Sequence, residues 1–194
     1  MRHNVSPSVD PFEALHEVTR RHRDNHACGA YTYDDGSLPG VLAAAVRAER
    51  IVEVGTALGY TACWLASAND TTTVDTIEND PQHVELARAE IANCGFDDRV
   101  SVHHGDAEVV LAGFDEAVYD VAFFDGFAPT LALLGLLRTR LRLGGLLIAA
   151  NLTLGDTAAV RAELADASRW RTYSFGETAI SVKTMAPALP SKRP

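Results

Sequence analysis

Apolar residues follow two different rhythms along the chain. Short apolar runs, typical of buried strands, alternate with longer segments in which apolar residues recur at helical spacing. The expected strands span residues 50–55, 72–78, 99–104, 119–125, 144–151, 170–175 and 178–184. The expected helices span about residues 11–23, 37–46, 60–68, 80–95, 130–141 and 155–167. Because strand and helix alternation builds a parallel sheet with helices on both faces, the pattern predicts a doubly wound α/β fold.

Capping residues mark the starts of three of these helices. Asp10, Asp80 and Asp156 stand where an N-cap is expected, and Pro11 and Pro81 follow two of them at the first helical position. The local signals therefore agree with the periodicity.

The end of the chain breaks the alternation. Two strand-like runs flank Gly176 with no helix between them, which predicts an antiparallel hairpin that completes a seven-stranded, mostly parallel sheet. Residues 186–194 are rich in proline and are expected to be a disordered tail. Residues 1–185 should form one domain, with a helical cap at about 10–48.

Composition and charge narrow the possible partners. The chain has 194 residues, and 17 Lys and Arg against 26 Asp and Glu give a formal net charge of -9. No basic cluster could follow a phosphate backbone, and no apolar run approaches a membrane span, so we expect a small molecule rather than nucleic acid or a membrane as partner. The three scattered cysteines and the absence of a signal-peptide pattern favour a cytoplasmic protein with reduced thiols.

The candidate chemistry begins at "EVGTALGY", residues 53–60. Gly55 and Gly59 lie between a strand and a helix, where an open α/β sheet binds ligands. A dinucleotide fold would carry a third glycine between them for the approach of a pyrophosphate. Its absence here points away from NAD and toward a ligand without phosphates.

Four acids follow the ends of the first four strands: Glu53, Glu78, Asp106 and Asp125. Such an edge would repel a pyrophosphate and suit a ligand with hydroxyls, an amino group and a positive centre. S-adenosylmethionine has these groups, and Glu78 is placed to accept hydrogen bonds from its ribose.

Five segments resemble, in order, those of class I S-adenosylmethionine-dependent methyltransferases: "IVEVGTALGYTACWLA", "TIENDPQHVELARAEI", "DRVSVHHGDAEVVL", "YDVAFFDG" and "LRLGGLLIAAN". The chain is most similar to the O-methyltransferases of the catechol and caffeoyl-CoA type. The resemblance covers about residues 36–183 and implies a Rossmann-like fold.

The resemblance also implies roles at matching positions. Gly55 and Gly59 would shape the loop under the methionine part, with Glu53 near its amino group. The other implied cofactor contacts are Thr56, Tyr60 and Thr61 around that loop, Glu78 at the ribose, Asn79 beside the adenine, Gly105, Asp106 and Ala107 at the adenine edge, and Asp125 at the methionine end. The segment 33–40 would cover the cofactor.

The sequence departs from the metal-dependent members of that family. Asp125 and Asn151 match their metal ligands, but Ala150 stands where a second Asp belongs and Ala128 where a Lys belongs. Because two oxygen ligands make a poor magnesium site, we expect no metal there. Asp125 is then the candidate catalytic base, and the rest of the catalysis would come from positioning.

The histidines give weaker signals. His103 and His104 are neighbours on a strand and point to opposite faces, so we expect one packed and one exposed. We interpret His22, His26 and Cys28, which lie in and after a polar stretch of the first helix, as a solvated face.

Two alternatives remain open from the sequence. One is an NAD-dependent oxidoreductase, and the other is a non-catalytic module that keeps the fold and the cofactor. The preferred reading is metal-independent methyl transfer to a small acceptor, oxygen rather than nitrogen, by a protein that is a possible homodimer.

Overall fold

The computed structural model describes residues 10–185, and the expected tail at 186–194 lies outside them. In this range the strands are β1 (Arg50–Val54), β2 (Thr73–Glu78), β3 (Val100–His104), β4 (Tyr119–Phe124), β5 (Leu141–Ala149), β6 (Trp170–Phe175) and β7 (Thr178–Lys183). The helices are α1 (Glu13–His26), α2 (Ser37–Ala45), α3 (Tyr60–Ala66), α4 (Pro81–Asn93), α5 (Ala107–Ala112), α6 (Leu131–Arg140) and α7 (Ala158–Leu164).

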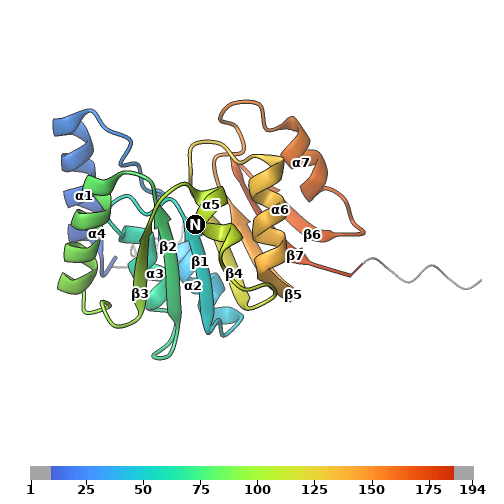
Figure 1. Cartoon of the computed structure of the whole chain (residues 1–194), viewed down its shortest axis with the longest axis horizontal. Helices are drawn as coiled ribbons and strands as arrows, with labels where there is room; N and C mark the ends of the chain where they lie inside the picture. The colour runs from blue at the N-terminus through green and yellow to red at the C-terminus, as the bar shows by residue number, and fades with distance from the viewer. Residues whose placement is uncertain (1–9, 186–194) are drawn as a thin grey trace, which may run out of the picture.

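These strands form one seven-stranded sheet in the order β3-β2-β1-β4-β5-β7-β6. The first five strands pair in parallel, whereas β7 is antiparallel to both β5 and β6. The α/β, Rossmann-like doubly wound fold and its antiparallel C-terminal hairpin are thus confirmed (Figure 1).

Successive strand residues serve two separate cores, one on each face of the sheet. Ile51 and Phe123 belong to the core beneath α2, α3 and α4, whereas their neighbours Val52 and Phe124 belong to the core beneath α5, α6 and α7. In Figure 1, α5 and α6 cross in front of the sheet, and α2 and α3 lie behind it. Both faces are buried, so the central strands read as continuous apolar runs.

Some element boundaries differ from the sequence-based expectation. The first helix is capped at Phe12 rather than Asp10, and α7 at Thr157 rather than Asp156. Both aspartates accept a backbone N–H two residues on, so they form turns just before the helices. The fifth strand begins at Leu141, which pairs with Tyr119, and extra residues of β5 around the two glycines shift the register before Leu146 pairs with Val121.

The strand order reverses between β1 and β4, which are neighbours although five elements separate them in sequence. Ligands of open α/β sheets bind outside the carboxyl ends of the strands at such a reversal. The loops that follow β1 and β4 therefore define the candidate site. Across residues 10–185, none of the helices combines the length and apolarity of a membrane span.

Candidate active site

The loop after β1 requires its two glycines. Gly55 has φ of 96°, and a Cβ there would lie 2.8 Å from the carbonyl oxygen of Asp125. Gly59 has φ of 97°, and a Cβ there would lie 2.7 Å from Cγ1 of Ile91 in α4. Any other residue would be strained and would collide. The loop is therefore pressed against the end of β4 on one side and α4 on the other.

Glu53 lies beneath this loop and is fully buried. Its carboxylate accepts hydrogen bonds from the hydroxyls of Thr61 and, at 2.6 Å, Thr76, and Thr76 also pairs with Thr56 at 2.6 Å. Burial, with the nearby charges of Asp125 and Glu78, raises the pKa of Glu53 to about 8, and the two hydroxyls oppose that rise. These hydrogen bonds fasten the glycine loop to β2 from the interior, and the carboxyl group of Glu53 does not reach the surface.

Glu78 ends β2 and organises the backbone around it. One oxygen accepts the amide of Ala57 at 3.0 Å, and the other accepts the amides of Asn79 and Asp80 at 3.0 Å each. The side chain is 10% exposed. Since each carboxylate oxygen can accept two hydrogen bonds, the oxygen facing Ala57 keeps one position for a ligand hydroxyl.

The next loop, after β3, contributes mainly through its backbone. The amide of Gly105 donates to the carbonyl of Glu78 at 2.9 Å, which carries the β2–β3 pairing into the loop. Asp106 is the N-cap of α5 and accepts the amides of Glu108 and Val109. The Asp106 carboxylate therefore caps the helix, which is a common structural role of an aspartate at this position. Ala107 begins the helix, and Asn79 lies exposed nearby.

Tyr60 fastens the N-terminal cap to the loop. Its hydroxyl donates to Asp10 at 2.6 Å and accepts the amide of Gly36 at 3.3 Å, and the ring is buried. The indole of Trp64 packs against α2, where a Cβ on Gly36 or Gly40 would overlap it. The cap is thus tied to the glycine loop at the start of α3.

Asp125 lies at a hollow of about 460 Å³ at the other half of the edge. The walls come from three distant segments: the strand ends, the cap and the β6–β7 turn. Besides Asp125, they consist of Thr32, Tyr33, Asp34, Asp35, Leu38, Asn151, Phe175, Gly176, Glu177 and Thr178. Part of the segment expected to cover the cofactor, 33–40, therefore lies beside Asp125.

The environment of Asp125 makes it a weak acid. Burial raises its pKa to about 7, Glu177 adds to the rise, and the amide of Asn151, which donates to it at 3.2 Å, opposes it. A carboxyl group with a pKa near neutrality can exchange a proton with a bound molecule at physiological pH. Such a group at a concave surface is a candidate for acid–base work.

The residues do not suit the magnesium ion of the metal-dependent relatives. The amide nitrogen of Asn151 is committed to Asp125 and, at 2.7 Å, to the carbonyl oxygen of Gly126. Ala150 is fully buried and brings no oxygen ligand in its side chain. Magnesium needs several oxygens in near-octahedral geometry, which Asp125 and Asn151 alone do not supply.

The contacts that close the hollow carry no signal in the sequence. Tyr33 pairs with Thr178 through their hydroxyls at 2.9 Å, across 145 residues of chain, and its ring meets Phe123 edge-on. Glu177 follows the turn glycine of the hairpin and was assigned no role. Only the expected hairpin could have indicated that these residues reach the strand ends.

The histidines differ in part from expectation. His103 pairs with Asp75 at 2.8 Å and His104 is exposed, as expected. The solvated-face interpretation is wrong for His22, whose Nε2 is buried and whose ring meets the buried His83 edge-on. The reason is that α1 lies beside α4, so this face of a polar helix is covered (Figure 1).

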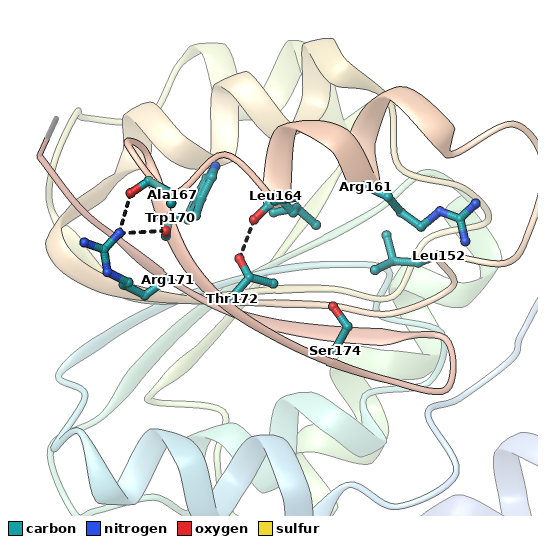
Figure 2. Close-up of a pocket in the computed structure, with 9 residues that line it drawn as sticks. Leu152, Arg161, Leu164, Ala167, Trp170, Arg171, Thr172 and Ser174 are labelled. Atoms are coloured by element: carbon teal, nitrogen blue, oxygen red, sulfur yellow. Dashed lines mark hydrogen bonds between the residues drawn. The ribbon is translucent and has the colours of Figure 1, made fainter.

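A second hollow, of about 440 Å³, lies between α7 and β6 (Figure 2). Its walls contain two arginines and no acid, cysteine or histidine, and Arg171 donates to the carbonyls of Ala167 and Trp170. Thr172 donates to the carbonyl of Leu164. This hollow is away from the strand ends that carry the acids, so it is a poorer candidate for catalysis.

Comparisons with known proteins identify the family of the chain. A methyltransferase domain family matches residues 52–151. A catechol O-methyltransferase of Mycobacterium tuberculosis is 35% identical over 97 residues, which cover 50% of this chain and 44% of that protein. A protein of Mycolicibacterium smegmatis that is named as an O-methyltransferase is 30% identical over 151 residues, covering 75% of this chain and 71% of that protein.

Solved structures of methyltransferases share the fold. An O-methyltransferase from Streptomyces achromogenes involved in tomaymycin synthesis, solved in complex with S-adenosylmethionine, superposes with a TM-score of 0.76 at 25% identity, over 92% of this chain and 93% of that one. An O-methyltransferase from Bacillus cereus in complex with S-adenosylhomocysteine has a TM-score of 0.75 at 20% identity, over 93% and 94%.

The fold and the glycine loop define a class I methyltransferase architecture. The chain belongs to the methyltransferase domain family and, within it, to the O-methyltransferases. The resemblance stated from the sequence is confirmed, and the oxidoreductase alternative is not favoured.

Proposed function

We propose that the protein transfers the methyl group of S-adenosylmethionine to an oxygen atom of a small molecule, without a metal ion. One observation carries the proposal. Asp125 lies both against the glycine loop, where its carbonyl would meet a Cβ on Gly55 at 2.8 Å, and at the wall of the 460 Å³ hollow. A donor on the loop and an acceptor in the hollow would meet beside one titratable carboxyl group.

The first half of the edge fits the donor. The two glycines let the loop lie close against the end of β4 and against α4, and Glu78 keeps an acceptor position for a ribose hydroxyl. Gly59, Thr56, Tyr60 and Thr61 shape or brace this loop. Glu53 acts from beneath it and stiffens the turn instead of touching the methionine amino group. The nucleoside would extend toward Asn79, Gly105, Asp106 and Ala107.

The bound cofactor supplies a methyl group already activated by its sulfonium, so the chain needs to hold an oxygen in line and remove its proton. Asp125 is the group placed both to hold this oxygen and to remove its proton. As a carboxylate it would accept the proton of a hydroxyl, and its pKa of about 7 matches a base that works near neutral pH. The hydrogen bond from the amide of Asn151 fixes the orientation of the Asp125 carboxyl group.

The hollow also limits the charge of the acceptor. Asp34, Asp35 and Glu177 line it together with Asp125, and none of the residues lining it is basic. Such a wall repels anions and attracts cations. The acceptor is therefore an uncharged or cationic hydroxyl compound rather than a phosphate-bearing thioester.

Transfer of radiolabelled methyl groups to matched phenols tests this function. We expect turnover on neutral or amine-bearing phenols, insensitivity to EDTA, and little turnover on carboxylate- or phosphate-bearing analogues. Cofactor binding with no turnover on a broad panel would instead support the non-catalytic module, and dependence on added magnesium would contradict the metal-independent mechanism.

Further aspects rest on the same proposal. We propose a single catalytic domain at residues 1–185 with the cap at about 10–48, working in the cytoplasm, where Cys28, Cys63 and Cys94 stay reduced. A homodimer would cover the stacked, exposed rings of Tyr173 and Phe175 on the edge strand β6. Sedimentation equilibrium tests the dimer.

The formal net charge of -9 argues against nucleic acid and anionic membranes as partners.

A further inference from the structure

Three potential metal ligands meet where the cap joins the cofactor half of the site. His22 lies in α1, Cys28 follows that helix, and His83 lies in the first turn of α4. One donor atom from each residue lies within 4.8 Å of the other two. His22 and Cys28 are near each other in sequence, but His83 lies 55 residues beyond Cys28, so the cluster depends on the tertiary fold.

Ordinary packing leaves one feature of this cluster unexplained. The Nε2 atom of His22 is buried and has no hydrogen-bond partner among the described residues. Buried polar atoms are nearly always paired, and an orphaned one calls for a water, an ion or another partner. His83 is 4% exposed, so its ring is equally shielded from bulk water.

The local backbone presents the ligands to one another. Ala27, the residue after α1, has φ of 49° in the left-handed region, which ends the helix and turns Cys28 back toward it. Asp80 caps α4 and accepts the amide of His83, which fixes the base of that side chain. Both turns are set by the chain itself.

We propose that His22, Cys28 and His83 bind a zinc ion. Two imidazoles and a thiolate form the nitrogen and sulfur set that zinc prefers, with bonds of about 2.0–2.3 Å. Donor atoms around a tetrahedral zinc are then about 3.3–3.7 Å apart, so the donors would need to approach by at most about 1.5 Å on binding. His26 lies one turn along α1, with its ring 4.5 Å from that of His22 between centroids, but its donor atoms lie outside the cluster. A water molecule would therefore take the fourth position.

The site would act as a clamp between the cap and the cofactor half. It joins α1 to α4, and Cys28 leads into the segment 32–38 that lines the acceptor hollow. The Nδ1 atom of His83 lies 3.9 Å from a carboxylate oxygen of Glu78. Zinc binding would therefore order the chain next to the group proposed to hold the ribose. This role differs from the magnesium site of the relatives and takes no part in the transfer step.

Metal titration of the tag-free full chain, stripped with EDTA, tests the proposal without any cofactor. We expect one equivalent of zinc to bind, a rise in Tm with zinc, and a thiolate-to-metal absorption band when cobalt(II) replaces zinc. Cys28→Ser should abolish that band, and His22→Gln should weaken zinc binding by about tenfold or more. The exposed His104 lies outside the cluster, so His104→Gln should bind like the wild type.

Folding is checked by circular dichroism without metal, and the test relies on His22 and Cys28 because they are less buried than His83. A wild type that binds no stoichiometric zinc would overturn the proposal. Equal binding by Cys28→Ser and the wild type would do the same and would mark the metal as adventitious. Because the readout is metal binding, failure here leaves the proposed methyl transfer intact, and failure of methyl transfer leaves this site intact.

Discussion

The acids at the carboxyl ends of the strands have opposite environments in the two halves of that edge of the sheet. In the β1–β2 half, Glu53 and Glu78 are almost fully bonded to hydroxyls and amides of their own loops. In the β4–β5 half, Asp125 and Glu177 lie at an open hollow and Asp125 has few donors to offset its burial. The acids of the first half are fixed by hydrogen bonds and support a binding surface. In the second half, the Asp125 carboxyl group is left free to exchange a proton with a bound molecule.

The largest expected effect tests the reactive half. Asp125→Asn keeps the shape of the side chain but removes the base, so methyl transfer should fall by about 10²–10⁴-fold. S-adenosylhomocysteine should still bind within a few-fold of the wild type, because this product lacks the sulfonium charge. Single-turnover rates and calorimetry measure the two quantities separately. Equal losses of rate and product affinity would erase the distinction between the halves.

The pH dependence sharpens the same point. The carboxylate is the active form of a base, so kcat/KM of the wild type should rise with pH through an apparent pKa near 7, the value that burial gives Asp125. The measurement uses an acceptor with no ionisable group in this pH range, so that the transition is assigned to a group of the enzyme. The residual activity of Asp125→Asn should lack this transition, and a transition that persists in the variant would assign it to another group.

The next effect tests the binding half. Glu78→Ala removes the acceptor of a ribose hydroxyl and also leaves the amides of Ala57, Asn79 and Asp80 without a partner. Hydrogen bonds to charged groups contribute about 1.5–3 kcal/mol each, so affinity for S-adenosylhomocysteine should fall by about 100-fold. Glu78→Gln keeps an acceptor and should lose about tenfold. Unchanged binding by the alanine variant would overturn the ribose assignment.

A smaller effect concerns the support beneath the glycine loop. Thr76→Val keeps the shape of the side chain but deprives the buried carboxyl group of Glu53 of one donor, at a cost of about 2 kcal/mol in the free energy of unfolding. Urea denaturation measures it. Thr73→Val, at the exposed start of the same strand, is the matched control and should change stability by less than about 0.5 kcal/mol.

The smallest effect lies where the cap meets the hairpin. Tyr33→Phe removes the hydroxyl that pairs with Thr178 and keeps the ring against Phe123, so stability should fall by about 1 kcal/mol or less. KM for the acceptor should rise a few-fold with kcat nearly unchanged. A large loss of cofactor affinity would mean that the cap serves the binding half instead.

The contrast also explains how much could be predicted from the sequence. The glycines, Glu53 and Glu78 act within about 25 residues of one another, so their spacing carries the information, and the strand alternation around them predicts the sheet. The departure from the metal-dependent pattern at Ala128 and Ala150 was equally visible in sequence. These features depend on local geometry and residue type.

The rest depends on contacts between distant segments. The hollow brings Tyr33 to Thr178, and the histidine–cysteine cluster brings α1 to α4, so neither follows from spacing. Glu53 was expected to face the cofactor, but the side chains of a strand alternate between the two faces of the sheet, and its own face is covered by α3. Burial of a polar residue at a strand end requires the tertiary structure.

Calorimetric titration of the full chain with S-adenosylhomocysteine and, separately, with NAD tests the central claim most directly. A binding half built for a phosphate-free nucleoside, lined by acids that repel a pyrophosphate, should bind S-adenosylhomocysteine at one site per chain and give little response to NAD. Tight binding of NAD with no response to S-adenosylhomocysteine would contradict the account.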